Sequence, residues 1–229
     1  MQIRRLSLDK GAHEARGIAV IIDVFRAFTC EPLMYRYGAE NIILESDIET
    51  CRRFAGKRIL IGEKEGRHIE GFDLMNSPSL IMGKGNIYFK NRTVMHRTTS
   101  GVTGALAALE HSNEVLLASY INARATAHYI LRRNPELVSI VAMGVIPDHK
   151  TLEDEFCGDY IESLLTGKAY DHITALDRIL SDETAQKFLR GDKSYYPKED
   201  PAICLQRDLV DFAQCAKHDN NMIVAEKCT

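Results

Sequence analysis

The feature that most constrains the fold is a run of apolar and β-branched residues, Ile18 to Val24, interrupted only at Asp23. Such a run is typical of a strand buried on both faces of a sheet. Short runs of the same character recur at 42–44, 58–61, 94–96, 115–118 and 138–142. Segments that favour helix lie between them, at 26–37, 47–55, 100–111 and 122–133, and the second is expected to begin with a Ser46–Glu49 capping box. Alternating strands and helices predict an α/β fold with a mostly parallel sheet.

The last third of the chain contains no convincing strand. Beyond Gly144, the segments 151–166, 171–189 and 201–217 favour helix, and 191–200 favours a surface loop. We therefore expect a three-layer α/β/α fold with a mixed, mostly parallel sheet and a helical C-terminal third that covers one face. No repeat or Gly/Ser linker divides the chain, so residues 1–229 are expected to form a single domain, with room for two lobes.

Composition excludes several classes of protein. A net charge of −3, from 29 basic and 32 acidic residues, leaves no broad basic face for nucleic acid. No apolar run approaches the roughly 20 residues that cross a bilayer, and the charged N-terminus does not read as a secretion signal. The six scattered cysteines are expected to be reduced. Together these features predict a cytoplasmic protein without nucleic-acid or membrane partners.

Two charged residues follow the first predicted strand at its carboxyl end, where ligands bind in open α/β sheets. Asp23 ends the apolar run, and Arg26 follows three residues later. In a functional interpretation, Asp23 is a metal ligand or catalytic carboxylate and Arg26 clamps an anion. A structural Asp23–Arg26 pair, or an N-cap for the next helix, explains the same residues equally well.

A second cluster, HRTTSGVTG at 96–104, comes directly after a predicted strand and opens a helix. The hydroxyl groups of Thr98, Thr99 and Ser100, with the free backbone N–H groups of a helix start, favour a phosphate-binding site. A capped helix with a glycine-rich packing face is the structural alternative.

A third cluster, GFDLMNSP at 71–78, lies in a segment, 63–90, that is too rich in Gly, Asn and charge for an ordinary connection. Ser77 before Pro78 predicts the start of a helix. Asn76, Ser77 and Asp73, with the earlier Glu63, supply the hard oxygen ligands that Mg²⁺ accepts. An Asx-type turn with solvated acids is the alternative.

Two further pairs stand at predicted helix starts. Ser119 and Asn122 mark a strand-to-helix transition, and Glu153 and Asp154 open a later helix. Acids in a first turn often only complement the helix dipole. A metal-binding role for Glu153 or Asp154 is supported because the other polar clusters already contain carboxylates that would need a cation.

Five segments, read in order, resemble the 2-phosphosulfolactate phosphatase family, the magnesium-dependent enzymes of coenzyme M biosynthesis. They are IIDVFRA, IGEKEGRHIEGFDLMNSP, RTTSG, LLASYINA and TLEDE. The resemblance covers about residues 17 to 160, with weaker similarity in an expected C-terminal helix around 208–211, and EGFDLMNSP is its most specific part. It implies Mg²⁺-dependent hydrolysis of a phosphate monoester on a small, sulfonated acid, giving sulfolactate and phosphate.

The resemblance also implies residue roles. Asp23, Glu63 and Asp154 are the expected metal ligands, and Asp73 or Glu153 is the expected proton-transfer carboxylate. Expected substrate-binding residues are Arg26, Asn76, Ser77, Thr98, Thr99, Ser100, Ser119 and Asn122. We expect attack by metal-activated water, although Asp23 as a catalytic nucleophile is also conceivable.

The chain departs from the family pattern at two motifs. Phe25, Phe28 and Cys30 stand where the family has leucine and small hydroxyl residues, and Ser100 and Val102 replace an amide and a hydroxyl. Substrate identity is therefore less secure than phosphatase chemistry. A non-catalytic anion sensor, or a lyase or transferase acting on a phosphorylated or sulfonated acid, stays open as an alternative. A homodimer is the default oligomer.

Overall fold

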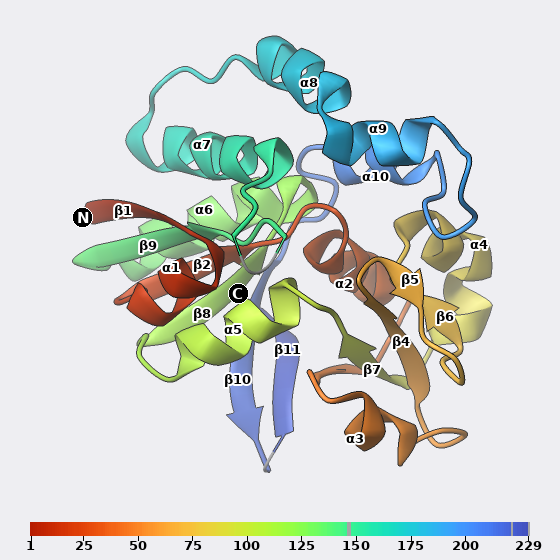
Figure 1. Cartoon of the computed structure of the whole chain (residues 1–229). Coiled ribbons are helices and arrows are strands. Elements are labelled where there is room, and N and C mark those ends of the chain that lie inside the picture. The colour runs from red at the N-terminus through yellow and green to blue at the C-terminus, as the bar shows by residue number, and fades with distance from the viewer. Residues whose placement is uncertain (146–147, 221, 229) are drawn as a thin grey trace.

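The computed structural model describes residues 1–145, 148–220 and 222–228. Within these ranges the chain forms one 11-stranded sheet with helices on both faces, as the predicted three-layer α/β/α fold requires (Figure 1). The strands are β1 (Gln2–Ser7), β2 (Ile18–Ile22), β3 (Asn41–Leu44), β4 (Ile59–Lys64), β5 (Arg67–His68), β6 (Leu74–Met75), β7 (Thr93–Arg97), β8 (Glu114–Ala118), β9 (Leu137–Ala142), β10 (Ala213–Asp219) and β11 (Met222–Cys228). The α-helices are α1 (Leu8–Glu14), α2 (Ala27–Arg36), α3 (Ile48–Arg52), α4 (Pro78–Phe89), α5 (Gly101–Leu109), α6 (Ala123–Arg133), α7 (Leu152–Thr166), α8 (His172–Ser181), α9 (Glu183–Leu189) and α10 (Asp200–Cys204).

The sheet consists of two parallel blocks joined by an antiparallel hairpin. Its order is β1-β9-β2-β8-β10-β11-β3-β7-β4-β5, with β6 beside β4. Strands β1, β9, β2 and β8 are parallel, and so are β3, β7, β4 and β6. The hairpin β10–β11 pairs antiparallel with β8 on one side and with β3 on the other. The mixed, mostly parallel sheet is confirmed.

The C-terminal hairpin corrects the expectation of a wholly helical last third. Of the segment 201–217, only the beginning is helical, in α10, and strand β10 starts at Ala213. Ala213, Gln214, Cys215 and Ala216 have weak strand propensity, but they are buried in the sheet beside β8. Pairing with distant strands therefore overrides the local preference.

Three smaller differences have local causes. The expected helix 171–189 is two helices, because the extended backbone of Asp182 ends α8 and its side chain caps α9 through the Thr184 N–H. Asp47, rather than Ser46, caps α3 by accepting from the Thr50 N–H. The expected irregular segment 63–90 contains β5, β6 and α4, and α4 begins as predicted, with Ser77 as its N-cap and Pro78 in its first turn.

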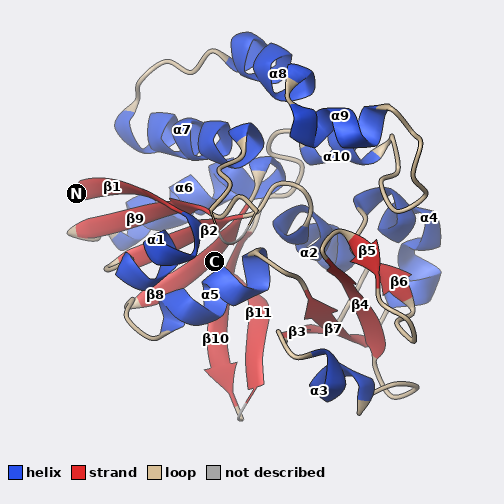
Figure 2. Cartoon of the chain, in the orientation of Figure 1, coloured by secondary structure: helices blue, strands red, loops and turns tan. Residues whose placement is uncertain are grey.

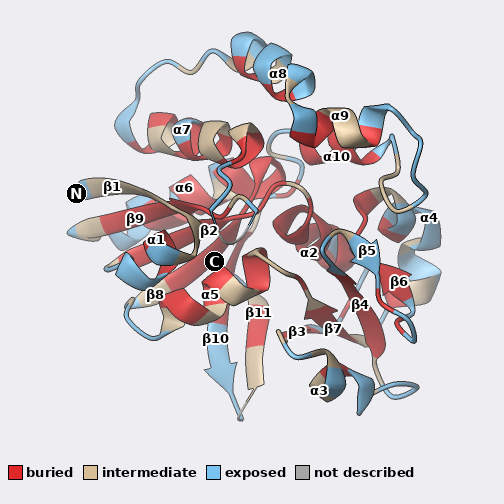
Figure 3. Cartoon of the chain, in the orientation of Figure 1, coloured by how far each residue is buried: buried red, intermediate tan, exposed pale blue. Residues whose placement is uncertain are grey.

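The apolar run at 18–24 forms the centre of the core, as expected. Ala19 and Ile21 pack on one face of the sheet with residues of α1, α2 and α5. Ile18, Val20 and Ile22 pack on the opposite face, where α6 and α7 cover them. Figure 3 shows β2 and its neighbours buried between these helix layers. Each fully buried isoleucine stabilises the fold by roughly 1.5–3 kcal/mol.

Sheet twist brings the carboxyl ends of the two parallel blocks together. Across the hairpin the blocks have opposite strand directions, and six strand-to-strand steps separate β2 from β4. At about 20–25° per step, the accumulated twist between β2 and β4 is roughly 120–150°. This rotation offsets most of the opposite strand direction of the two blocks. Figure 2 shows the result: β1 and β9 run almost perpendicular to the hairpin in this view. Residues after β2 and within β4 can therefore line one cavity.

Two observations concern the environment of the chain. No helix among the described residues is long and apolar enough to span a membrane. All six cysteines are free thiols, and five of them are buried.

The hairpin is also anchored to α2, and this contact predicts a loss of stability. The buried Tyr35 hydroxyl donates a hydrogen bond to the Ala225 carbonyl oxygen of β11. Tyr35→Phe leaves that acceptor without its partner, so the free energy of unfolding should fall by about 1–2 kcal/mol in urea titrations. Tyr37→Phe is the matched control, because its hydroxyl has no partner among the described residues. Equal losses in both variants would contradict this account.

Candidate active site

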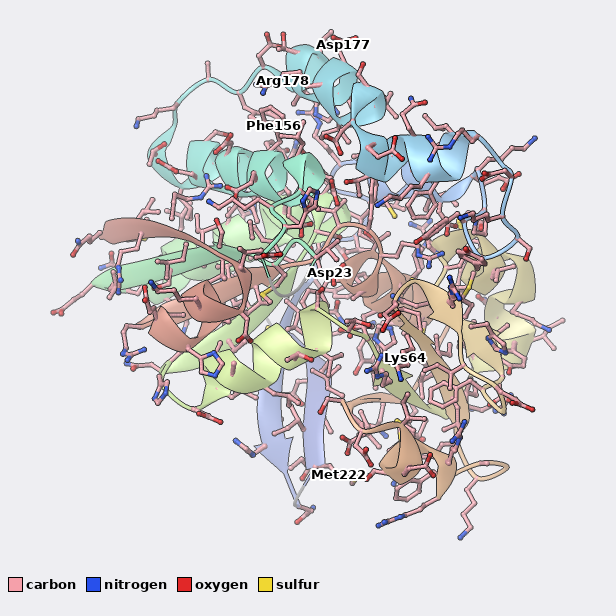
Figure 4. All side chains as sticks on the ribbon, viewed as in Figure 1. Asp23, Lys64, Phe156, Asp177, Arg178 and Met222 are labelled. Carbon is pink, nitrogen blue, oxygen red and sulfur yellow. The ribbon has the colours of Figure 1, made fainter. Side chains whose placement is uncertain are left out.

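A cavity of about 230 Å³ lies where the two strand blocks meet. Seven residues singled out from the sequence line it: Asp23, Arg26, Glu63, Asn76, Thr98, Thr99 and Ser100. Figure 4 labels Asp23 at this junction. Sequence analysis did not anticipate the other side of the cavity, which comes from Glu65, Gly66, Val145, Thr184, Lys187, Phe188 and Tyr196, with Phe25 and Gly144.

Asp23 is held by the first residues of two helices. Its carboxylate accepts from the Ala27 N–H of α2 at 3.0 Å and from the Gly101 N–H of α5. A Cβ atom at Gly101 would lie 2.7 Å from Asp23 Oδ2, so glycine is required for α5 to approach this closely. Burial raises the pKa of Asp23 to about 6, and the nearby Glu63 charge adds to this. Asp23 therefore accepts from the first N–H of α2, although Arg26 rather than Asp23 stands at the N-cap position, and Asp23 also lines the cavity.

Glu63 occupies part of the predicted phosphate-binding cluster. Its carboxylate oxygens accept from the Thr99 N–H at 2.6 Å and the Gly66 N–H at 2.5 Å. Thr98 Oγ1 accepts from the Val102 N–H in the first turn of α5. Several donors expected to bind an anion thus already bond to groups of the protein. Ser100 lines the same part of the cavity.

Glu153 and Asp154 lie next to Asp23 but outside the cavity lining. Asp154 accepts from the Val24 N–H at 2.7 Å and the Gly144 N–H at 2.8 Å, tying together the segments that follow β2 and β9. Glu153 is 3% exposed, and its Oε2 has no partner among the described residues. Burial raises the pKa of Glu153 to about 7 and that of Asp154 well above its usual range. The charge of Asp23 adds to both shifts.

Arg26 pairs with Asp200 rather than with Asp23, so the structural Asp23–Arg26 pair is wrong. Arg26 Nη1 lies 3.0 Å from Asp200 Oδ2, and both side chains are buried. Asp200 also accepts from the Ser77 and Ser79 hydroxyls, which ties Arg26 to the start of α4. Ser77 thereby bonds to Asp200 instead of lining the cavity. Sequence reasoning missed Asp200, because it stands at the end of an expected surface loop, 174 residues from its partner.

Asn76 reaches the cavity from a buried network. His96 Nδ1 lies 2.7 Å from Glu31 Oε1, and His96 Nε2 lies 2.9 Å from Asn76 Oδ1. Because Asn76 Oδ1 lies beside the ring, the Asn76 amide nitrogen is the polar atom of this side chain without a partner among the described residues, and Asn76 lines the cavity. His96 is thus a structural side chain that orients Asn76.

Three other predicted residues bond to backbone groups of the protein and do not line the cavity. Asp73 accepts from the Leu60 N–H at 2.8 Å. Ser119 donates to the Phe28 carbonyl oxygen, and Asn122 bonds to Ser119 N and to the Leu117 carbonyl oxygen. Their expected roles in proton transfer and substrate binding stay predictions.

The carboxylates do not form a closed metal cage. Within the described ranges, no group of three or more His, Cys, Asp or Glu side chains is arranged to hold a metal ion. Of the three expected ligands, Asp23 and Glu63 line the cavity and Asp154 does not. Mg²⁺ is usually bound by one or two carboxylates, with waters and substrate phosphate completing its shell. The Asp23–Glu63 pair fits that requirement.

Comparison with known proteins gives one consistent result. Residues 6–225 match the model of a family described as 2-phosphosulpholactate phosphatase. A probable 2-phosphosulfolactate phosphatase of Bacillus subtilis (strain 168) is 30% identical over 234 residues, covering 97% of this chain and 98% of the relative. A protein of the same description from Caldicellulosiruptor saccharolyticus is 33% identical over 227 residues, covering 90% of each chain. The match extends through the C-terminal hairpin, beyond the segments in which the sequence showed the resemblance.

The raised pKa of Glu153 predicts a pH-dependent stability. The unfolded side chain ionises near pH 4.5, whereas burial raises the folded pKa to about 7, so its contribution to stability is lost as pH rises between these values. With chelator present, Glu153→Gln should therefore raise the free energy of unfolding by roughly 1–3 kcal/mol at pH 8, and by less at pH 5. Urea titrations at both pH values measure this.

The control for this experiment is Asp177→Asn, an exposed carboxyl on α8 (Figure 4). It should change the free energy of unfolding by less than about 0.5 kcal/mol at either pH. If Glu153→Gln had the same effect at both pH values, the raised pKa of Glu153 would be contradicted.

Proposed function

The chain belongs to the 2-phosphosulpholactate phosphatase family, and on this premise we propose that it hydrolyses the phosphate ester of a small phosphorylated and sulfonated acid, with Mg²⁺ in the cavity. The curated relatives are described as acting on 2-phosphosulfolactate. Water is the proposed attacking group, and inorganic phosphate and a hydroxy acid are the products.

The observation that carries the proposal is the charge of the cavity. Three acids line it, Asp23, Glu63 and Glu65, against two cations, Arg26 and Lys187. Arg26 is already paired with Asp200. A substrate with phosphate, carboxylate and sulfonate groups would be repelled by such a surface unless a cation intervened. The two carboxylates Asp23 and Glu63 need a cation, and the cavity must also bind an anionic substrate. A divalent metal ion would meet both requirements.

Asp23 and Glu63 are the residues that would hold Mg²⁺. Both carboxylates are oriented by backbone N–H groups, so little rearrangement is needed to bind a cation. When bound, the ion would neutralise charge on the phosphoryl oxygens and lower the pKa of a coordinated water. Asp154 would support the site indirectly, by holding the segments that follow β2 and β9.

Other residues of the chain would orient the phosphoryl group and move protons. The free amide donor of Asn76 and the hydroxyl of Ser100 face the cavity. Glu153 stays a candidate for proton transfer, because a pKa of about 7 suits general acid–base catalysis near neutral pH. Its position beside Asp23, rather than in the lining, favours transfer through that side chain or through water.

Phosphate release tests the proposal directly. The purified protein, with Mg²⁺, is expected to release inorganic phosphate from 2-phosphosulfolactate, and excess chelator should abolish the release until Mg²⁺ is restored. A phosphate assay and chromatography of the organic product would measure both products. Binding without release would favour the sensor alternative, and loss of substrate without phosphate would favour a lyase.

Asp23→Asn tests the role of the central carboxylate. The amide keeps the shape of the side chain but removes the charge that would hold Mg²⁺, so kcat should fall by about 10²–10⁴-fold. The midpoint of thermal unfolding should change little, because removal of a buried charge offsets the loss of one acceptor for the backbone N–H groups. Asp177→Asn, on the exposed face of α8, should retain wild-type kcat. A fully active Asp23→Asn enzyme would exclude Asp23 from the mechanism.

The cytoplasmic location and the homodimer stay predictions from the sequence.

A further inference from the structure

We propose that Lys187 binds the second acid group of the substrate and so selects phosphorylated acids over simple phosphate monoesters. The inference rests on the proposed function and deepens it, because it names the class of substrate that the cavity prefers.

Lys187 belongs to a face of α9 that closes the cavity. Thr184, Lys187 and Phe188 all line the cavity, and their spacing of three and four residues places them on one side of the helix. The carboxylates Asp23 and Glu63, in contrast, come from the ends of strands. The cavity therefore has an acidic part on the sheet and a separate basic group on α9.

Lys187 is the lining cation without an ion pair among the described residues. Arg26 is neutralised by Asp200 at 3.0 Å. The natural helical partner of Lys187 would be Glu183, four residues earlier, but Glu183 pairs with Arg190 through two hydrogen bonds. The charge of Lys187 lowers the pKa of Glu183 less than Arg190 does, and the half-buried Lys187 forms no ion pair among the described residues, so its ammonium can bind a ligand.

Aromatic packing fixes α9 against the cavity. The Phe188 ring lies 5.6 Å from that of Phe25 and 4.9 Å from that of Tyr196, and the Arg26 guanidinium lies 5.3 Å from its centroid. Phe25, a departure from the family pattern, therefore packs against the helix that carries Lys187. This apolar surrounding lowers the local dielectric constant, which strengthens the attraction between an ammonium and an anion.

The chemistry of a short phosphorylated acid matches this division. Its phosphoryl group would occupy the acidic part of the cavity with the cation, and the remaining acid groups then need a positive partner elsewhere. A lysine ammonium has three donors on a flexible stem, so it can donate hydrogen bonds to either a carboxylate or a sulfonate. The phosphate monoester of a neutral alcohol has no second acid group for Lys187 to bind.

Steady-state kinetics of Lys187→Gln tests the inference. Removing one charge-assisted hydrogen bond should raise KM for 2-phosphosulfolactate by about 10–100-fold with little change in kcat. KM for p-nitrophenyl phosphate should stay within about twofold, and Lys187→Arg should retain part of the selectivity. The third substrate is 2-phospholactate, which has the carboxylate but lacks the sulfonate. If Lys187→Gln raises its KM as much as that of 2-phosphosulfolactate, Lys187 binds the carboxylate. If its KM does not change, Lys187 binds the sulfonate.

Lys198→Gln is the matched control, because Lys198 is exposed on the loop between α9 and α10. It should leave all three KM values unchanged. The inference would be overturned if Lys187→Gln raised KM equally for all three substrates, or if it changed KM for none of them. If the wild type hydrolyses none of the three, the proposed function fails by itself. Calorimetric titration with sulfolactate then tests Lys187 separately, with at least tenfold weaker binding expected for Lys187→Gln.

Discussion

The structure depends on how the fold buries several carboxylates around one small cavity. A buried carboxylate destabilises a protein unless hydrogen bonds or opposite charges compensate for its lost hydration. Asp23, Glu63 and Asp154 each accept two backbone N–H groups, and Asp200 accepts from Arg26 and two serines. These bonds fix the loops after the strands, so the requirement to satisfy the carboxylates also shapes the site. Burial, with a smaller contribution from neighbouring carboxylates, raises the pKa of Asp23, Glu153 and Asp154.

The C-terminal hairpin makes this arrangement possible. Without β10 and β11, the two parallel blocks would have no shared edge, and residues of β2 and β4 would belong to separate sheets. Sheet twist across the hairpin reorients the two blocks, and residues of both blocks line one cavity. The site is thus a product of long-range topology, although most of its residues come from short local motifs.

The basic residues of the cavity divide into two kinds. Arg26 is buried, paired and stacked against aromatic rings, so its main effect is to hold α2, α4 and the loop before α10 together. Lys187 is unpaired within the described ranges and stands on a helix of the C-terminal third. The cavity therefore combines one buried, paired cation with a half-buried cation on α9.

The sequence alone determined the central strands, the helix that starts at Pro78, and the polar clusters around Asp23, Asn76 and Thr98, because each depends on neighbours within a few residues. It could not determine β10, whose weakly strand-forming residues gain their conformation from pairing with β8 and β11. Nor could it identify Asp200, whose partners Arg26 and Ser77 lie more than a hundred positions away, or place Lys187 in the lining of the cavity. It also could not separate Asp73 and Ser119, which bond to backbone groups 13 and 91 residues away, from residues that line the cavity. Only the tertiary structure decides which polar side chains form hydrogen bonds within the protein and which remain available to a ligand.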